Sequence, residues 1–164
     1  MPNGQLLTNE EVERCFQELG WRWLPGPRPG FWVLPVWNPE QNRGEMVIVD
    51  NGQGNPNFIG ARLQIVRATR NEDCVRKALC LTNGTLDLVK LYMDEDRDVF
   101  ARVVVPRFKE MFHRQMLRHA LGVVVAGAAF VLPILQCCLE DEHCDVEAAL
   151  LSRMEGLRGR AGPP

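Results

Sequence analysis

The sequence RFKEMFHRQMLRHALGVVVAGAAFVLPILQCCL, residues 107–139, decides the fold of this chain. Pro106 precedes it and predicts a helix start, because the N–H that proline lacks is not needed in a first helical turn. Residues 120–135 carry no charge, so this half is apolar all round, which is typical of a buried helix or a membrane span. Apolar residues in the first half recur every three or four positions, on one helix face: Phe108, Met111, Phe112, Met116 and Ala120.

Length separates these two possibilities. A membrane span needs about 20 apolar residues, and this run reaches that length only when residues 136–139 are counted and Pro133 is tolerated. Arg114 and Arg118 before the run, with acidic residues after it, would suit an anchor whose N-terminal side faces inward. The length favours a helix buried in the protein or in a dimer interface. A membrane-anchored protein that uses Ala120–Leu139 is kept as an alternative.

The composition predicts one soluble domain with its own core. The chain has 164 residues, 46% of them hydrophobic, and a net charge of −2, so no global basic field attracts it to nucleic acid. Met1–Asn9 lacks the basic and apolar regions of a secretory signal, and six cysteines in such a chain do not predict a disulfide framework. We therefore expect a protein of the reducing cytoplasm.

Catalytic motifs are missing from the sequence. Ser152 is the only serine, which leaves no candidate for a Ser-His-Asp hydrolase. No nucleophile stands at a recognisable spacing from a base, and there is no phosphate-binding loop. We therefore expect a protein that is not an enzyme and uses no cofactor.

Local patterns predict an α+β chain. Thr8 and Glu11 form a capping box that starts a first helix, which Gly20 ends, and a second helix runs from Asn71 to Gly84. Strands are expected where short apolar runs or alternating patterns occur, at 21–24, 31–37, 46–49, 58–66, 86–93 and 99–105. A last short helix is expected at 145–155. The Gly-, Pro- and Arg-rich residues 156–164 are expected to be disordered, which leaves 1–155 as the domain.

The strand 31–37 and the late helix carry the candidate protein interface. Both faces of this strand are apolar, and Pro35 predicts an edge position. Its tryptophans are therefore expected either in the core or on a surface that binds a partner. The candidate interface residues are Trp32, Trp37, Val123, Ala126 and Phe130.

A cluster of cysteines and a histidine near the end of the late helix is a candidate metal site. Cys137, Cys138, His143 and Cys144 lack the C-x-x-C spacing and the second half-site of a structural zinc site. Adjacent cysteines on a helix also point about 100° apart. The sequence therefore favours free thiols here and predicts no metal.

A basic stretch between Arg97 and Arg118 is the candidate nucleic-acid contact. A local patch of cations can bind phosphates, but no RRM, KH or helix-turn-helix signature accompanies it. A solvated helix face explains the stretch better. A regulator that acts at DNA, directly or through a DNA-binding protein, is kept as an alternative function. The residues of this candidate contact are Arg102, Arg107, Lys109, Arg114 and Arg118.

The chain resembles the YbjN-like family. Leu7-Thr-Asn-Glu-Glu-Val12, then Glu18-Leu-Gly-Trp21, is similar to the opening of that family, and Leu81-Thr-Asn-Gly84 before a hairpin is similar to its middle. The element order, over Leu6–Leu139, is also that of class I type III secretion chaperones. The resemblance implies an α+β fold in the order α-β-β-β-α-β-β-α, with helices packed on an antiparallel sheet.

The resemblance also implies a function. Proteins of this kind are generally small cytoplasmic binding modules, often homodimers, and stress responses and motility are associated with the family. Apolar surface without catalytic residues agrees with such a role. We therefore expect a non-enzymatic, chaperone-like or adaptor protein that binds and regulates another protein, whose identity the sequence does not reveal.

Overall fold

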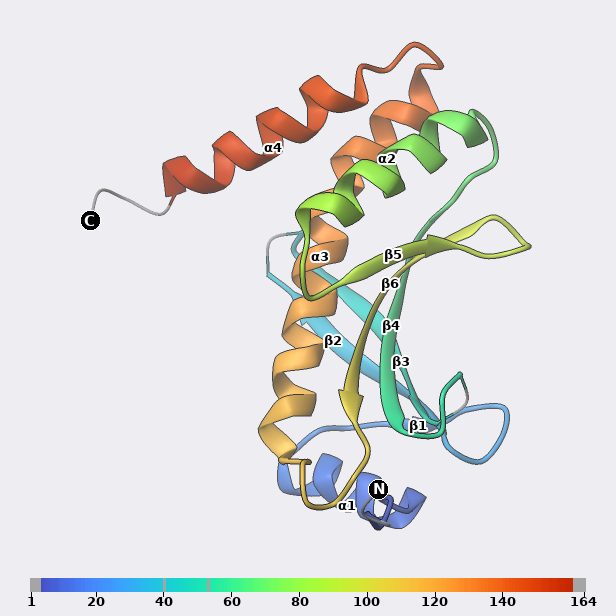
Figure 1. The fold of residues 1–164 in the computed structure, drawn as a ribbon, viewed down its shortest axis with the longest axis vertical. Helices are drawn as coiled ribbons and strands as arrows, with labels where there is room; N and C mark the ends of the chain where they lie inside the picture. The colour runs from blue at the N-terminus through green and yellow to red at the C-terminus, as the bar shows by residue number, and fades with distance from the viewer. Residues whose placement is uncertain (1–3, 40, 53, 161–164) are drawn as a thin grey trace.

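Helix α3 (Arg114–Glu140) lies along a six-stranded sheet in the computed structural model, with α1 near one end of this helix and α2 and α4 near the other (Figure 1). The structure describes residues 4–39, 41–52 and 54–160. The other helices are α1 (Asn9–Glu18), α2 (Glu72–Thr85) and α4 (Val146–Arg160). The strands are β1 (Leu24–Pro25), β2 (Phe31–Asn38), β3 (Arg43–Asn51), β4 (Phe58–Arg67), β5 (Lys90–Met93) and β6 (Asp98–Pro106).

The sheet is antiparallel throughout, in the order β1-β2-β3-β4-β6-β5. Helix α2 separates β4 from the β5–β6 hairpin in sequence, and the hairpin returns so that β6, not β5, pairs with β4. This architecture confirms the predicted α+β fold. Beyond the element order that the resemblance implied, it contains the two-residue edge strand β1, next to the strand expected at 21–24, and α4, where a last helix was expected.

Strand β2 is second in the sheet, but the part that holds its proline lies at the edge, as Pro35 predicted, because the outermost strand β1 has only two residues. The short β1 pairs only with Trp32 and Val33, so the outer side of β2 is open beyond them in the described part of the chain. Pro35 lies in this open part, opposite Met46 of β3. A residue without an N–H is tolerated there because no described strand pairs with the outer side of β2 at this position.

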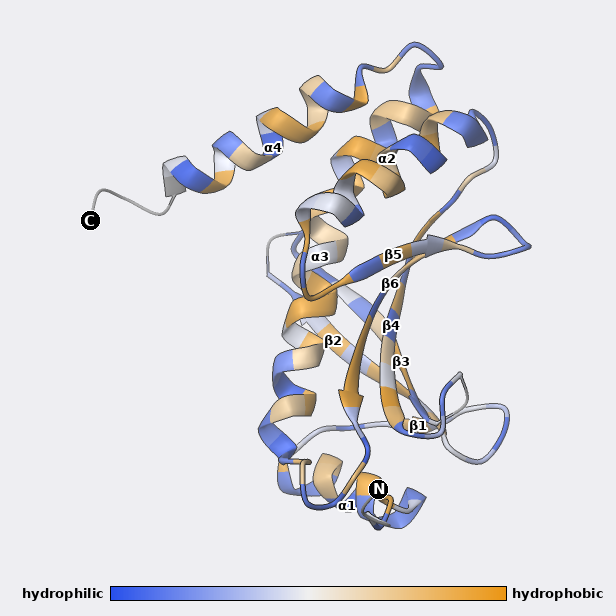
Figure 2. Ribbon diagram, viewed as in Figure 1, coloured by the Kyte–Doolittle hydropathy of each residue, from blue (hydrophilic) through white to orange (hydrophobic). Residues whose placement is uncertain are grey.

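The apolar character of α3 is explained by burial. Its buried residues recur at alternating spacings of four and three, which keeps them on one stripe against the sheet. This stripe consists of Leu117, Leu121, Val124, Ala128, Val131, Leu135 and Cys138. The helix is long and apolar enough to cross a membrane, but 61% of its most apolar window is buried inside the protein. Figure 2 shows its apolar half beside the apolar strands.

The long helix begins later than the sequence predicted. We expected a helix from Arg107, but β6 runs to Pro106 and α3 starts at Arg114. The segment between them pairs with the N-terminal segment: Leu7 N–H donates to the Arg107 carbonyl at 3.0 Å, and Lys109 N–H donates to the Gln5 carbonyl at 2.9 Å. These long-range hydrogen bonds outweigh the helical spacing of the apolar residues.

The C-terminal helix is longer than predicted. Residues 156–160 were expected to belong to a disordered tail, whereas α4 continues to Arg160 in the structure. Val146 and Leu150 are buried and anchor the first turns of the helix, so that the later residues extend a helix that is already fixed. Residues 161–164 lie outside the described part of the chain.

Candidate binding groove

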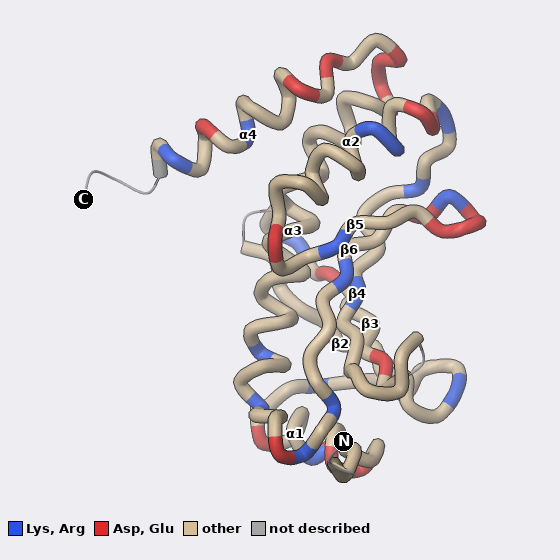
Figure 3. Tube along the Cα trace, in the orientation of Figure 1, with Lys and Arg blue, Asp and Glu red and all other residues tan. Residues whose placement is uncertain are grey.

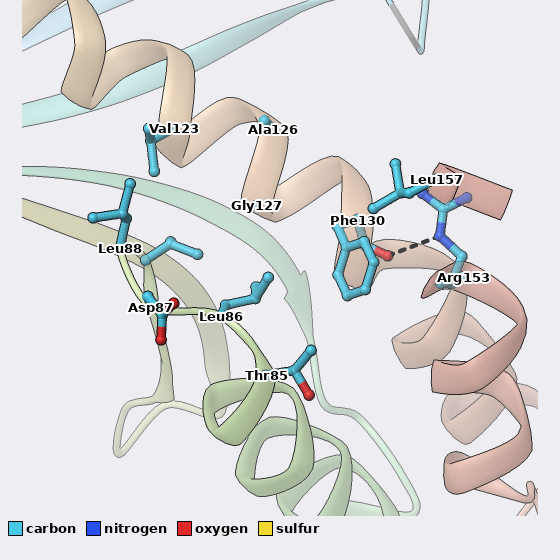
Figure 4. Close-up of a pocket in the computed structure, with 11 residues that line it drawn as sticks. Thr85, Leu86, Asp87, Leu88, Val123, Ala126, Gly127, Phe130, Arg153 and Leu157 are labelled. Carbon is cyan, nitrogen blue, oxygen red and sulfur yellow. Dashed lines mark hydrogen bonds between the residues drawn. The ribbon is translucent and has the colours of Figure 1, made fainter. Parts of the chain in front are cut away.

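A groove of about 400 Å³ opens between α3, α4 and the segment that joins α2 to β5 (Figure 4). Figure 4 shows Leu88 of the joining segment and Val123 of α3 pointing toward one another across it. The groove is lined by Thr85, Leu86, Asp87, Leu88, Val89, Val123, Ala126, Gly127, Phe130, Arg153 and Leu157. We call it the α3–α4 groove.

At the floor of the groove, the α3 backbone at Gly127 lies close to the side chain of Val89. A Cβ placed on Gly127 would lie 2.7 Å from Cγ1 of the buried Val89, well inside van der Waals contact. Glycine at this position therefore lets α3 approach the segment before β5 closely. Ala126, the preceding residue of the helix, is exposed, and its small side chain leaves the hollow unfilled.

Arg153 of α4 closes one end of the groove by binding α3. Pro133 has no N–H, so the Ala129 carbonyl four residues earlier lacks its usual helical donor. Arg153 supplies one: its Nη2 lies 3.3 Å from that carbonyl, and its Nε lies 3.1 Å from the Phe130 carbonyl. The guanidinium also lies over the Phe130 ring, 5.6 Å from the centroid. A proline inside α3 is thus matched by an arginine on α4.

The lining determines what the groove can bind. Among the lining residues, Thr85, Asp87 and Arg153 have polar side chains, and Arg153 is already engaged with the α3 carbonyls. Two leucines at the rim are exposed, Leu88 by 64% and Leu157 by 49%. The arrangement offers apolar contact area and few groups that could orient a reacting substrate.

The predicted interface residues lie in three different places in the structure. Val123, Ala126 and Phe130 line the α3–α4 groove. Trp32 does not belong to an interface, because it is only 2% exposed, its Nε1 donates to Glu13 Oε1 at 2.8 Å, and it packs in the core. Trp37 is 60% exposed and lines a second hollow on the β2 side of α3.

Sequence reasoning missed the leucines and the arginine of the groove. Residues 86–93 were predicted as a strand, but β5 begins only at Lys90, so Leu86 and Leu88 lie in an irregular segment. Arg153 was missed because its partners are carbonyls of another helix, which no sequence pattern identifies. The only sequence feature that pointed to this contact was Pro133, which predicts an unpaired carbonyl on α3 but does not identify the group that pairs with it.

The basic candidate residues do not form a free patch. Lys109 pairs with Glu11 at 2.7 Å and Arg114 with Glu18 at 2.9 Å, and the hydrogen bond from Lys109 lowers the pKa of Glu11. The others have different neighbours: Arg107 donates to the Leu7 carbonyl, Arg102 lies 4.0 Å from Asp50, and Arg118 lines the second hollow. Figure 3 shows acidic and basic residues side by side near α1. The structure therefore offers little support for a phosphate-binding surface.

The late cysteines are arranged differently from the prediction of free thiols. Cys137 and Cys144 form a disulfide, because the chain turns back after Glu140 and brings Cys144 over the end of α3. Burial, the largest cause, and the hydrogen bond with Cys74 of α2 together raise the pKa of the neighbouring Cys138 thiol to about 12. His143 is exposed and lies outside this cluster of sulfurs.

Comparisons with known proteins identify the fold. No protein-family model matches the sequence, and no curated protein matches it. A chain of the HopA1–SchA chaperone–effector complex matches the structure with a TM-score of 0.50 and 12% identity, over 74% of this chain and 90% of that one. This match confirms the predicted chaperone-like α+β fold, and at such identity the likeness concerns the fold alone.

Two other solved structures match over similar lengths. YbjN from E. coli has a TM-score of 0.48 and 13% identity, over 78% of this chain and 92% of that one. An uncharacterized protein from Methanothermobacter thermautotrophicus has a TM-score of 0.48 and 17% identity, over 79% of this chain and 97% of that one.

Proposed function

We propose that this chain is a non-enzymatic, chaperone-like binding module that takes an apolar segment of another protein into the α3–α4 groove. The observation that carries this proposal is the apolar lining of the groove, which lies open between three separate elements. Exposed leucines at its rim favour an occupant that covers them, because burying one such side chain fully contributes about 1.5–3 kcal/mol.

The polar groups of the groove favour a peptide over a metabolite. Small-molecule sites place several polar groups so that they converge on the ligand. Here Asp87 lies beside Leu88 in the joining segment, and Arg153 is committed to the carbonyls of Ala129 and Phe130. A peptide segment needs mainly apolar contact area and shape, which this groove supplies.

The fold supports the same proposal. The matching chain comes from a complex described as chaperone and effector, in which one protein binds another. The family resemblance adds a cytoplasmic location and a stress response as the setting of this role. No catalytic group enters the proposal.

A charge placed in the groove is expected to weaken binding. Peptides selected from a displayed random library should be apolar, and their affinity, measured by fluorescence anisotropy, should fall at least about tenfold in Ala126→Glu, because the carboxylate would be buried without a partner. Gln136→Glu adds the same charge to an exposed position of the same helix outside the groove and should bind normally. Equal binding by wild type and Ala126→Glu would remove the groove from the proposal.

We further propose that the protein forms a homodimer through α4. Leu151 is 59% exposed on this helix and does not line the groove. Sedimentation equilibrium is expected to give the mass of a dimer, and Leu151→Glu should shift it to a monomer, because the new charge would lie in the interface. Ser152→Glu, which charges the adjacent exposed position, is the matched control. A wild-type protein that sediments as a monomer contradicts this proposal without affecting the groove.

A further inference from the structure

Three cysteine sulfurs lie together where α2, α3 and the turn before α4 join, and a fourth is bonded to one of them. Cys74 comes from the first turn of α2, Cys137 and Cys138 from the last turn of α3, and Cys144 from the turn before α4. The Sγ atoms of Cys74, Cys138 and Cys144 all lie within 4.8 Å of one another, and Cys137 is bonded to Cys144. We call this set the four-cysteine cluster.

The sequence argued against a metal site because adjacent cysteines on a helix point apart, but the structure supplies further sulfurs beside them. Cys137 and Cys138 point apart as neighbours on a helix, but Cys144 lies close to both of them, and Cys74 closes the set from another helix. The side chain of Asn71 donates to the Cys138 carbonyl at 2.8 Å, which holds the start of α2 against the end of α3. The sulfurs are therefore gathered by the fold, independently of their spacing in sequence.

We propose that, once the Cys137–Cys144 disulfide is reduced, the four-cysteine cluster binds one Zn²⁺ ion. Thiolates select soft or borderline ions, and structural zinc is bound by four such ligands in a tetrahedron. Zn–S distances of about 2.3 Å give S···S edges of about 3.8 Å. The three sulfurs that now lie within 4.8 Å of one another thus need to move by only about 1 Å, and the sulfurs of Cys137 and Cys144 separate to the same edge distance once their bond is reduced.

Electrons and protons are conserved in the reduction of the disulfide and in the binding of zinc. A phosphine or dithiol reductant delivers two electrons, with two protons from solvent, to the Cys137–Cys144 bond and gives two thiols. Binding of Zn²⁺ then releases up to four protons from the four thiols to solvent and leaves a tetrathiolate complex. In a reducing compartment the thiol form is the one expected, so no further redox partner is required.

The site would join three helices at one point. The disulfide connects only the end of α3 to the turn before α4, whereas the ion would also hold α2. Because α4 carries Arg153 and Leu157, bound zinc would also steady one wall of the groove. The zinc proposal does not depend on what the groove binds, and its test uses no peptide.

Cobalt titration tests the proposal directly. Full-length protein is reduced with a phosphine, stripped with a chelator and titrated anaerobically with Co²⁺. We expect one equivalent to bind, with the thiolate-to-cobalt charge-transfer band and the strong visible bands of tetrahedral Co²⁺, and Zn²⁺ to bleach these bands. Zinc should also raise the melting temperature of the reduced protein.

Matched cysteine variants locate the site. Cys74→Ser is expected to weaken cobalt binding at least about tenfold, as loss of one ligand should. Cys80→Ser, which changes an exposed cysteine of the same helix outside the cluster, should bind like wild type. Cys144→Ala gives a second test outside regular helix if Cys74→Ser fails to fold, with circular dichroism as the check. Absent cobalt bands in the reduced wild type, equal loss in Cys80→Ser, or rapid return of a disulfide in the presence of zinc would each overturn the proposal.

Discussion

Replacing Gly127 with alanine is expected to destabilise the protein by about 1–3 kcal/mol, although alanine is the better helix former. The new Cβ would lie 2.7 Å from Cγ1 and 3.1 Å from Cγ2 of Val89, which is buried and cannot move freely. Either α3 shifts away from the segment before β5 or Val89 leaves its preferred rotamer. Urea unfolding followed by circular dichroism measures the loss.

Gly122 provides the matched control on the same helix. A Cβ added there meets no atom within 4 Å, and the residue is exposed. Gly122→Ala should therefore stabilise the protein by about 0.5–1 kcal/mol through helix propensity alone. The two variants carry the same change in the same helix with opposite expected signs. Equal stabilities would mean that α3 does not pack against Val89 as closely as the structure shows.

Arg153→Met is expected to cost about 1.5–3 kcal/mol, the usual value for hydrogen bonds from a charged group. Methionine keeps much of the apolar length but cannot donate to the carbonyls of Ala129 and Phe130. The cation–π contact with the Phe130 ring is lost as well. Arg158→Met, which changes an exposed arginine of the same helix, should be nearly neutral.

A double-mutant cycle isolates the role of the proline. Pro133→Ala restores the N–H that the Ala129 carbonyl lacks, so this carbonyl no longer needs Arg153. The cost of Arg153→Met should then be smaller in the Pro133→Ala background, with a coupling of about 0.5–3 kcal/mol. Additive effects would show that Arg153 holds α4 by some contact other than the carbonyl that the proline leaves unpaired.

Prediction from sequence succeeded where local chemistry decides the outcome. The capping box of Thr8 and Glu11 is present as expected, with Thr8 N–H donating to Glu11 Oε2 at 2.8 Å. The uncharged half of α3 was expected from its length to be covered mainly by protein, and 61% of the most apolar window of this helix is buried. Pro35 was correctly expected at an edge, because its missing N–H is a property of the residue itself.

Prediction failed where distant segments compete for the same backbone. The residues after Pro106 have helical spacing, yet they pair with the N-terminal segment, because Leu7 and Gln5 are brought beside them only in the folded chain. The position of Trp32 in the core likewise depends on a residue distant in sequence. The ring of Phe16 lies edge-on to the Trp32 ring, with 5.4 Å between the ring centroids. Neither contact has a sequence signal of fixed spacing.

The sequence by itself determined the periodic elements of this protein: the α+β class, the capped first helix and the long helix whose apolar stripe requires a cover. These follow from hydrogen bonding and side-chain spacing within one segment. Only the tertiary structure decided the groove, the contact of Arg153 with α3 and the four-cysteine cluster. Each of these joins residues from separate elements, and their approach depends on how helices pack on the sheet, which short-range patterns do not encode.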